Sequence, residues 1–204
     1  MNRIIPLKFN LRHSDKVHKL KDDLEKLFLI IRDAHCAYEI WWILVSKDGR
    51  REYSHALYNF KDFFEPIMRA NSTTMFIALF KLYDERNDTL NLIKLLENAE
   101  SLGVIDLSKN IKLKRKKSEV KKIWKKICIL RNNVLAHRSY LLTVKEVYRL
   151  ADINPNKIKR MIDLSLKIFN SIWMKIEKDP KQLGEFTYMD TVRILETLQA
   201  QEKR

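Results

Sequence analysis

The stretch from Ser118 to Ser139 reads SEVKKIWKKICILRNNVLAHRS and combines a regular apolar pattern with a dense positive charge. Successive residues of an α-helix are rotated by about 100°, so positions three, four and seven apart share one face. The apolar residues recur at this spacing and predict a helix with one buried stripe. The stripe consists of Val120, Trp124, Ile127, Arg131, Val134, Leu135 and Arg138. It is apolar except for its two arginines.

Arg131 stands where the pattern favours leucine, between Ile127 and Val134. A guanidinium is permanently charged, and burying it without a partner is costly. Arg131 therefore needs an acid, a shared cleft or a ligand. Asp84 and Glu85, which end the second predicted long helix, are the acids that we expect as structural ion-pair partners. Such a pair is compatible with a functional role for Arg131.

His137 projects roughly 120° around an ideal helix from Arg131. The two side chains reach one cleft only if the helix lies at the edge of a groove or at an interface. The alternative is that His137 merely makes a hydrogen bond at a helix end, where the helix dipole favours a cationic imidazole.

Helical periodicity continues through most of the chain on both sides of this stretch. Pro66 lies inside the second apolar run, so we expect a kink or break near Glu65. Ser118, Thr143 and Asn154 are candidate helix starts, and Asn154 is followed by a proline at the first helical position. The predicted helices are 14–45, 52–86, 89–102, 118–139, 143–150, 154–178 and 187–201.

The composition supports the same fold class. The chain has 204 residues with 46% hydrophobic residues, enough for a core without metal or disulfide staples, and its 3 Gly and 4 Pro disfavour a turn-rich β fold. We therefore predict an all-α, up-and-down helical bundle in a single domain, 1–204. In this domain the segment 151–204 adds C-terminal helices that pack on a bundle formed by 1–150. Cys36 and Cys128 lie on apolar stretches, and we interpret both as structural thiols.

The formal net charge of +14 and the pI of about 9.7 favour anionic partners. Nucleic acid is favoured over membrane, because the best candidate span, 27–45, is interrupted by Arg32, Asp33 and Glu39. The N-terminus lacks the apolar segment of a signal peptide, and no zinc-type Cys/His spacing occurs. We expect a cytoplasmic protein without a metal or another cofactor.

Basic residues are concentrated immediately before the stripe arginine. A strip of them along one helical side suits contacts with RNA phosphates, although an ordinary solvated face is the alternative. The aromatic residues Trp41, Trp42, Phe63, Phe64 and Trp173 fit core or dimer contacts better than base-stacking platforms. The candidate RNA-binding residues are Lys114, Arg115, Lys117, Lys121, Lys122, Lys125, Lys126 and Arg138.

Arg131, Asn132 and His137 also match the signature of the HEPN superfamily, in which an arginine and a polar residue precede a histidine near a helix end. The sequence LRNNVLAHRS most resembles that of HEPN proteins of the abortive-infection class, U-type branch. The segment ALFKLYDERNDTLNLIKLL, from Ala78 to Leu96, resembles the region that precedes the motif in that branch.

This resemblance implies a HEPN-like bundle and a metal-independent endoribonuclease, whose composite site forms between two subunits at a dimer axis. A ribose 2′-hydroxyl would attack the adjacent phosphate, with His137 as proton acceptor, Arg131 as phosphate ligand and Asn132 as an orienting group. The biological role would be that of a toxin or antiphage effector, and structured RNA such as tRNA is a reasonable target. The alternatives are a non-catalytic module that binds nucleic acid or a partner, and a subunit that an antitoxin inhibits or modifies. Tyr140 resembles only loosely the tyrosine that is modified in some toxin–antitoxin pairs.

Overall fold

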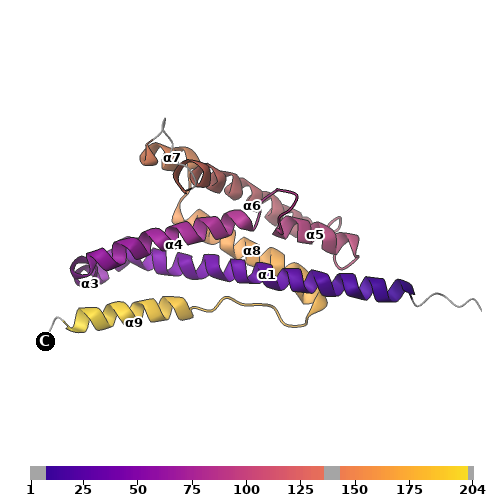
Figure 1. Cartoon of the computed structure of the whole chain (residues 1–204), viewed down its shortest axis with the longest axis horizontal. Helices are drawn as coiled ribbons and strands as arrows, with labels where there is room; N and C mark the ends of the chain where they lie inside the picture. The colour runs from indigo at the N-terminus through magenta and orange to yellow at the C-terminus, as the bar shows by residue number, and fades with distance from the viewer. Residues whose placement is uncertain (1–7, 136–142, 202–204) are drawn as a thin grey trace, which may run out of the picture.

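The computed structural model describes residues 8–135 and 143–201, and every regular element within these two ranges is a helix. Helix α1 (Lys8–Val45) runs along the length of the molecule, and the other helices are arranged around it (Figure 1). The all-α prediction is therefore confirmed. None of the described helices is long and apolar enough to span a membrane. The extent of the domain, 1–204, stays a prediction.

Helix α1 is the axis of the main core, and it begins at Lys8 rather than at Ser14 or Asp15. Its apolar residues recur at alternating intervals of four and three, which places them on one face. The fully buried members of this face are Leu20, Leu24, Leu27, Ile31 and Ala34. Truncating one such leucine to alanine typically costs about 2–5 kcal/mol of stability.

The second long helix of the prediction is instead three helices. They are α2 (Lys47–Glu52), α3 (Ser54–Asn59) and α4 (Lys61–Lys81). The interruptions fall at Tyr53 and Phe60, whose backbone angles leave the helical region, and α4 continues through Pro66. The helix therefore does not break near Glu65, and a kink there stays a prediction. The earlier breaks turn the chain around the end of α1, where Ala56 and Phe64 join a small second core.

Helix α5 (Leu92–Ser101) begins at Asn91, whose side chain accepts a hydrogen bond from the backbone N–H of Lys94 at 2.8 Å. The amide of Asn91 also donates to the carbonyl of Asp84 at 2.6 Å, so the cap holds the preceding loop closed. The predicted start near Thr89 was therefore slightly early. Gly103 ends this segment with a φ of 71°, a value that glycine adopts without strain.

Helix α6 (Ile111–Leu130) starts earlier than predicted, because its N-terminal cap is Asn110 rather than Ser118. It continues into η1 (Arg131–Leu135), a π-helical turn. The starts at Thr143 and Asn154 are confirmed, because these residues cap α7 (Val144–Ala151) and α8 (Pro155–Ile176). The last helix, α9 (Phe186–Gln201), agrees with the predicted 187–201.

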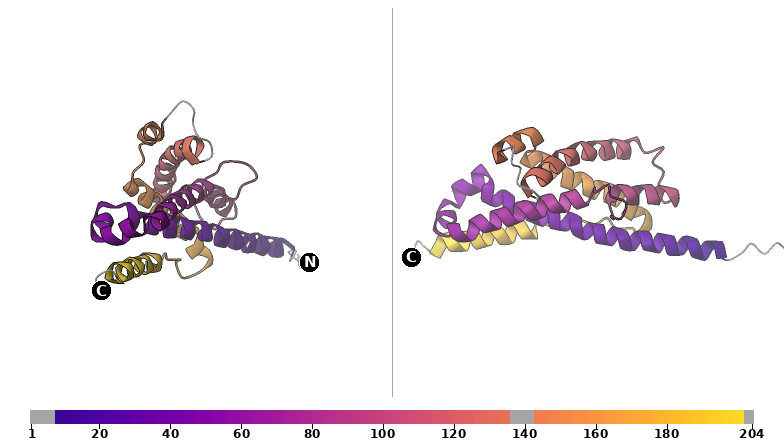
Figure 2. Two further views of the ribbon diagram at one scale, coloured as in Figure 1. Left: turned by 60° about the vertical axis from the view of Figure 1, so that its left-hand side comes forward. Right: turned by 45° about the horizontal axis from the view of Figure 1, so that its top comes forward.

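Helix α8 is central rather than peripheral, because it packs against α1, α5 and α6. Its Ser165 donates to the carbonyl of Met161 at 2.7 Å, so the buried Tyr83 hydroxyl donates to Ser165 at 2.7 Å. This bond joins the end of α4 to the middle of α8. Helix α9 lies beside the C-terminal half of α1 and contributes Leu195 to the small second core (Figure 2).

Candidate functional site

The end of helix α6 carries the part of the sequence motif that the structure describes. Val120 and Ile127 are buried and Trp124 is half-buried, so these members of the predicted stripe do face the core. At Arg131 the α-helix passes into the π-helical turn η1, and the Arg131 N–H bonds to the carbonyls of Cys128 and Ile127. Single π-helical turns are rare in proteins, and those that occur are often found at functional sites.

The Arg131 guanidinium lies over an aromatic ring. Its central carbon is 4.8 Å from the ring centroid of Phe80, near the end of α4. Phe80 in turn stacks on Trp124, with ring centroids 6.0 Å apart, and the Trp124 indole N–H donates to the Phe80 carbonyl at 3.3 Å. A cation over an aromatic face is stabilised by about 0.5–2 kcal/mol, depending on its exposure. Trp124 and Phe80 thus form a layered support on which the Arg131 guanidinium lies.

The hydrogen bonds of Arg131 are only partly satisfied within the described residues. Nη1 donates to the Asn132 side-chain carbonyl at 3.0 Å. The Nε atom is buried without a hydrogen-bond partner among the described groups. Asn133 is occupied locally, because its amide donates to the Ile129 carbonyl at 2.8 Å. The outer Nη groups of Arg131 therefore keep N–H donors that can bind an anion, whereas the buried Nε is closed to solvent.

The predicted ion-pair partners of Arg131 are engaged elsewhere. The carboxylate of Asp84 accepts from Arg86, with Nη2 at 2.8 Å, and Glu85 pairs with Lys121 at 2.9 Å. No described carboxylate forms an ion pair with Arg131, so the expected direct pair is absent from this part of the chain. The reason is local: Arg86 follows Asp84 by two residues and reaches it within the same turn.

Asp84 still shapes the electrostatics around Arg131. Hydrogen bonding from Arg86 lowers the pKa of the Asp84 carboxyl, burial opposes this effect, and the charge of Arg131 adds to the lowering. Asp84 is 4% exposed, so its charge is poorly screened by solvent. The result is a fixed negative charge near the guanidinium that leaves its hydrogen-bonding edge unoccupied.

Cys128 is half-buried one helical turn before Arg131. Burial raises the pKa of its thiol to about 11, and the charge of Glu85 adds to the shift. The thiol is therefore protonated near neutral pH, which disfavours a role as a thiolate nucleophile. Cys36 and Cys128 are both free thiols, and their structural role stays a prediction.

His137, Arg138 and Tyr140 lie outside the described residues. The flanking elements are described, and α7 packs against both α6 and η1. The chain therefore leaves and re-enters the described part of the molecule beside the Arg131 end of α6. Within the described ranges, no group of His, Cys, Asp or Glu side chains is arranged to hold a metal ion.

The predicted basic strip is divided by ion pairs. Lys117 bonds to Glu97 at 2.7 Å, Lys121 to Glu85, and Lys126 to Asp152. Lys114 donates to a backbone carbonyl, that of Ser108, at 3.3 Å. The strip residues that make no ion pair with a described carboxylate are Lys114, Arg115, Lys122 and Lys125. Part of the strip is thus a solvated, acid-paired face.

The aromatic residues also separate into two groups. Phe64 and Trp173 are buried and Trp41 is half-buried, as expected for core positions. Trp42 is 37% exposed and Phe63 is 59% exposed, which leaves these two available for contacts outside the chain.

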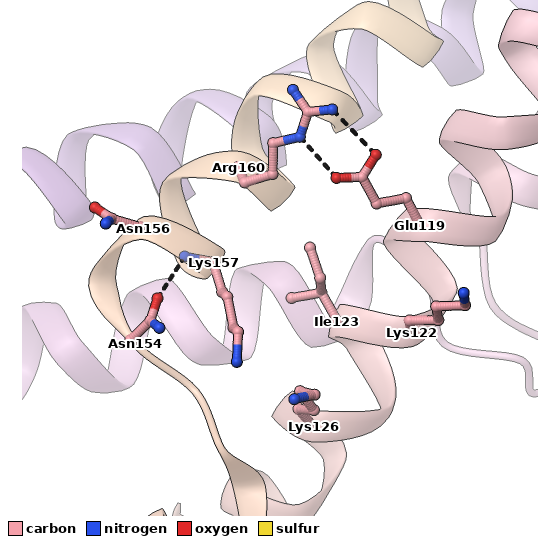
Figure 3. A pocket seen from close by; sticks show the side chains of 8 residues that line it. All are labelled: Glu119, Lys122, Ile123, Lys126, Asn154, Asn156, Lys157 and Arg160. Carbon is pink, nitrogen blue, oxygen red and sulfur yellow. Dashed lines mark hydrogen bonds and ion pairs between the residues drawn. The ribbon is translucent and has the colours of Figure 1, made fainter.

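A groove between α6 and the beginning of α8 was not predicted from the sequence. It has a volume of about 590 Å³ and is lined mainly by basic and amide side chains (Figure 3). Sequence periodicity indicated which α6 residues share a side, but it did not indicate that α8 closes the opposite wall. The lining residues are Glu119, Lys122, Ile123, Lys126, Asn154, Asn156, Lys157 and Arg160.

Comparison with known protein families gives one match. A HEPN family model described as AbiU2 matches residues 14–194, which is most of the chain. This range includes α1 from its second turn, the motif and most of α9. No curated protein and no solved structure matches the chain.

Proposed function

Because the chain belongs to the AbiU2 family of HEPN proteins, an abortive-infection family, we propose that it is a metal-independent endoribonuclease. The observation that carries the proposal is the arginine at the end of α6. Arg131 is held over Phe80, has a buried Nε without a described partner and pairs with no described acid. A phosphate group of RNA is the anion that suits this planar set of donors.

The proposed chemistry begins with the ribose 2′-hydroxyl beside the scissile phosphate. His137 takes the hydroxyl proton, the 2′-oxygen bonds to phosphorus, and the bond to the 5′-oxygen breaks. The products are a 2′,3′-cyclic phosphate and a 5′-hydroxyl, whose proton comes from an imidazolium. Histidine suits this proton transfer because its ordinary pKa is about 6.5.

Arg131 has a different task in the same step. Negative charge accumulates on the phosphate oxygens in the transition state, and a positioned guanidinium stabilises it in a preorganised way. Asn132, whose carbonyl already accepts from Arg131, orients the guanidinium or the phosphate. Donors of this kind typically contribute about 10²–10³ in rate.

A homodimer is part of the proposal. A two-fold axis near the ends of two α6 helices brings two copies of Arg131 and His137 into one composite site. The layered support of Phe80 and Trp124 gives each subunit a rigid contribution to that site. Sedimentation at micromolar protein concentration tests this element, and a monomer contradicts it.

A non-catalytic RNA-binding module is the second candidate function. It is favoured by the basic groove and by lysines without described acid partners, because neither feature requires His137. This candidate predicts RNA binding without cleavage in every variant.

The test is cleavage of bulk tRNA by the purified protein in EDTA. We compare wild type with His137→Ala and with His18→Ala, a matched change at an exposed histidine of α1. The endoribonuclease proposal predicts cyclic-phosphate ends from wild type and His18→Ala, and none from His137→Ala. Cleavage that survives in His137→Ala contradicts the proposed site, and binding without cleavage by wild type favours the binding module.

A further inference from the structure

The groove between α6 and α8 lies away from the Arg131 site. Lys122, in its wall, is nine residues before Arg131, which is about 180° around an ideal helix and about 14 Å along it. Arg131 faces Phe80 of α4, whereas Lys122 and Lys126 face the beginning of α8. Ligands at the two places therefore approach opposite sides of α6.

The charge of the groove is not balanced. Its walls contain the cations of Lys122, Lys126, Lys157 and Arg160. Two carboxylates form ion pairs with these cations. Glu119 binds Arg160 through two contacts of 2.8 and 3.0 Å, and Asp152 binds Lys126 and Lys157. Two positive charges remain in excess. Lys122 makes no ion pair with any described carboxylate, so its ammonium is available to an external anion.

The paired cations of the groove keep some N–H donors that their carboxylates do not use. Lys126 and Lys157 each donate to the same carboxylate oxygen and to the backbone carbonyl of Asp152, so each ammonium keeps one further N–H group. Arg160 uses Nε and Nη2 for Glu119 and keeps its Nη1 donors. Figure 3 shows the Lys157 side chain extending between the two helices toward Lys126. Hydrogen bonding to Asp152 raises the pKa of Lys157, which therefore stays charged.

We propose that this groove is a second site on the protein, which binds a phosphate group of the RNA backbone through Lys122, Lys126 and Lys157. A volume of about 590 Å³ accommodates a nucleotide-sized group. The apolar stems of the lysines and Ile123 form the floor, and the ammonium groups meet the phosphate oxygens. The inference deepens the proposed function and rests on RNA being the ligand of the protein.

The first experiment measures binding of a fluorescent 2′-O-methyl oligoribonucleotide, which lacks the attacking hydroxyl and is not cleaved by the proposed route. Fluorescence anisotropy at several KCl concentrations compares wild type, Lys122→Gln and Lys19→Gln. Lys19 is an exposed lysine of α1, so its substitution removes the same charge far from the groove. We expect Lys122→Gln to weaken binding three- to tenfold and to lower the salt slope by about 0.7, the value for one phosphate contact on a single strand. Equal effects of the two variants overturn the proposal.

Glu119→Gln provides a change of the opposite sign. It removes a carboxylate that competes for Arg160, so we expect tighter binding by two- to fivefold and an intact fold by circular dichroism. A merely structural role for the Glu119–Arg160 pair predicts weaker or unchanged binding, which contradicts the proposal.

AMP distinguishes a free nucleotide from the RNA backbone as the source of the phosphate. If AMP raises the Tm of wild type but not of Lys122→Gln, while both bind the oligonucleotide equally, the groove takes a free nucleotide and the RNA proposal is overturned. The proposed catalytic function fails separately. Lys122-dependent RNA binding without cleavage by wild type supports the groove and contradicts the ribonuclease, whereas cleavage with Lys122-independent binding does the reverse.

Discussion

Positive side chains have different surroundings on the two faces of helix α6, the face that carries Arg131 and the face that lines the groove with α8. At the end of α6, Arg131 is held by an aromatic ring and its Nε has no partner among the described groups, while Asp84, whose pKa the charge of Arg131 helps to lower, is paired with Arg86. In the groove, three of the four cations already touch a carboxylate, and the excess charge comes from the exposed Lys122 and from the two lysines that share Asp152. A fixed guanidinium suits a single reacting phosphate, whereas exchangeable ammonium groups suit a mobile backbone. Under the proposed function, the Arg131 end of α6 serves catalysis and the groove serves RNA affinity.

Among the residues that the structure describes, the largest expected effect is that of Arg131→Lys. Lysine keeps the charge but loses the planar fork and most of the contact with Phe80, so we expect the single-turnover cleavage rate to fall by about 10²–10³. The rate is measured at saturating RNA, so that weaker binding does not contribute. A loss of less than tenfold contradicts a role for Arg131 in the transition state.

A smaller effect is expected from Asp84→Asn, which removes the charge that binds Arg86. We expect a loss of about 1–2 kcal/mol in the free energy of unfolding at pH 7, because the acceptor is buried but Arg86 is mostly exposed. The pKa of Asp84 is lowered in the folded state, so its stabilisation is present above the ordinary value near 3.8 and is lost as the pH falls through the lowered value.

Urea unfolding of wild type and Asp84→Asn at pH 7 and pH 3 measures this difference. If the Asp84 charge stabilises the fold, the difference in the free energy of unfolding between the two proteins is smaller at pH 3 than at pH 7. A gap that is constant or grows on acidification contradicts it. Asp88→Asn is a suitable control, since Asp88 is an exposed carboxylate of the same loop.

Phe80→Leu tests the aromatic support of Arg131 more finely. Leucine retains an apolar contact but has no π face, so about 0.5–1.4 kcal/mol of cation–π attraction is lost and the cleavage rate falls about two- to tenfold. Phe76→Leu, at a buried position one turn earlier in α4, is the control for packing loss alone. If both variants lose Tm and cleave RNA equally well, the ring does not position Arg131.

The smallest effect belongs to the groove. Its acid Asp152 has a pKa of about 2, chiefly because Lys126 and then Lys157 donate hydrogen bonds to it. Its contribution is therefore present above the ordinary value near 3.8 and is lost as the pH falls through about 2. We expect Asp152→Asn to lower the Tm slightly at pH 6 and not at pH 2. An equal loss at both values contradicts the charge-based explanation.

The sequence predicted the helical class because that class depends on periodicity and short-range caps, whereas the functional site stays a prediction. The apolar stripe from Val120 to Ile127, the caps at Thr143 and Asn154 and the glycine stop at Gly103 are local patterns, and the structure confirms them. Contacts between residues of different elements could not be predicted from such local patterns. Arg86 competed for Asp84 two residues away, and the turns at Tyr53 and Phe60 follow from packing around the end of α1. The opposing wall of the groove comes from α8, about 35 residues later in the chain, where no spacing rule applies.

Cleavage and binding measured side by side on the same two variants test the division of α6 most directly. The measurements are the single-turnover rate at saturating RNA and the affinity for the uncleavable oligonucleotide, for Arg131→Lys and Lys122→Gln. We predict that Arg131→Lys loses at least tenfold in rate and less than threefold in affinity, and that Lys122→Gln loses three- to tenfold in affinity with a lower salt slope. The account is contradicted if Arg131→Lys loses affinity but not rate, or if Lys122→Gln binds RNA as wild type does.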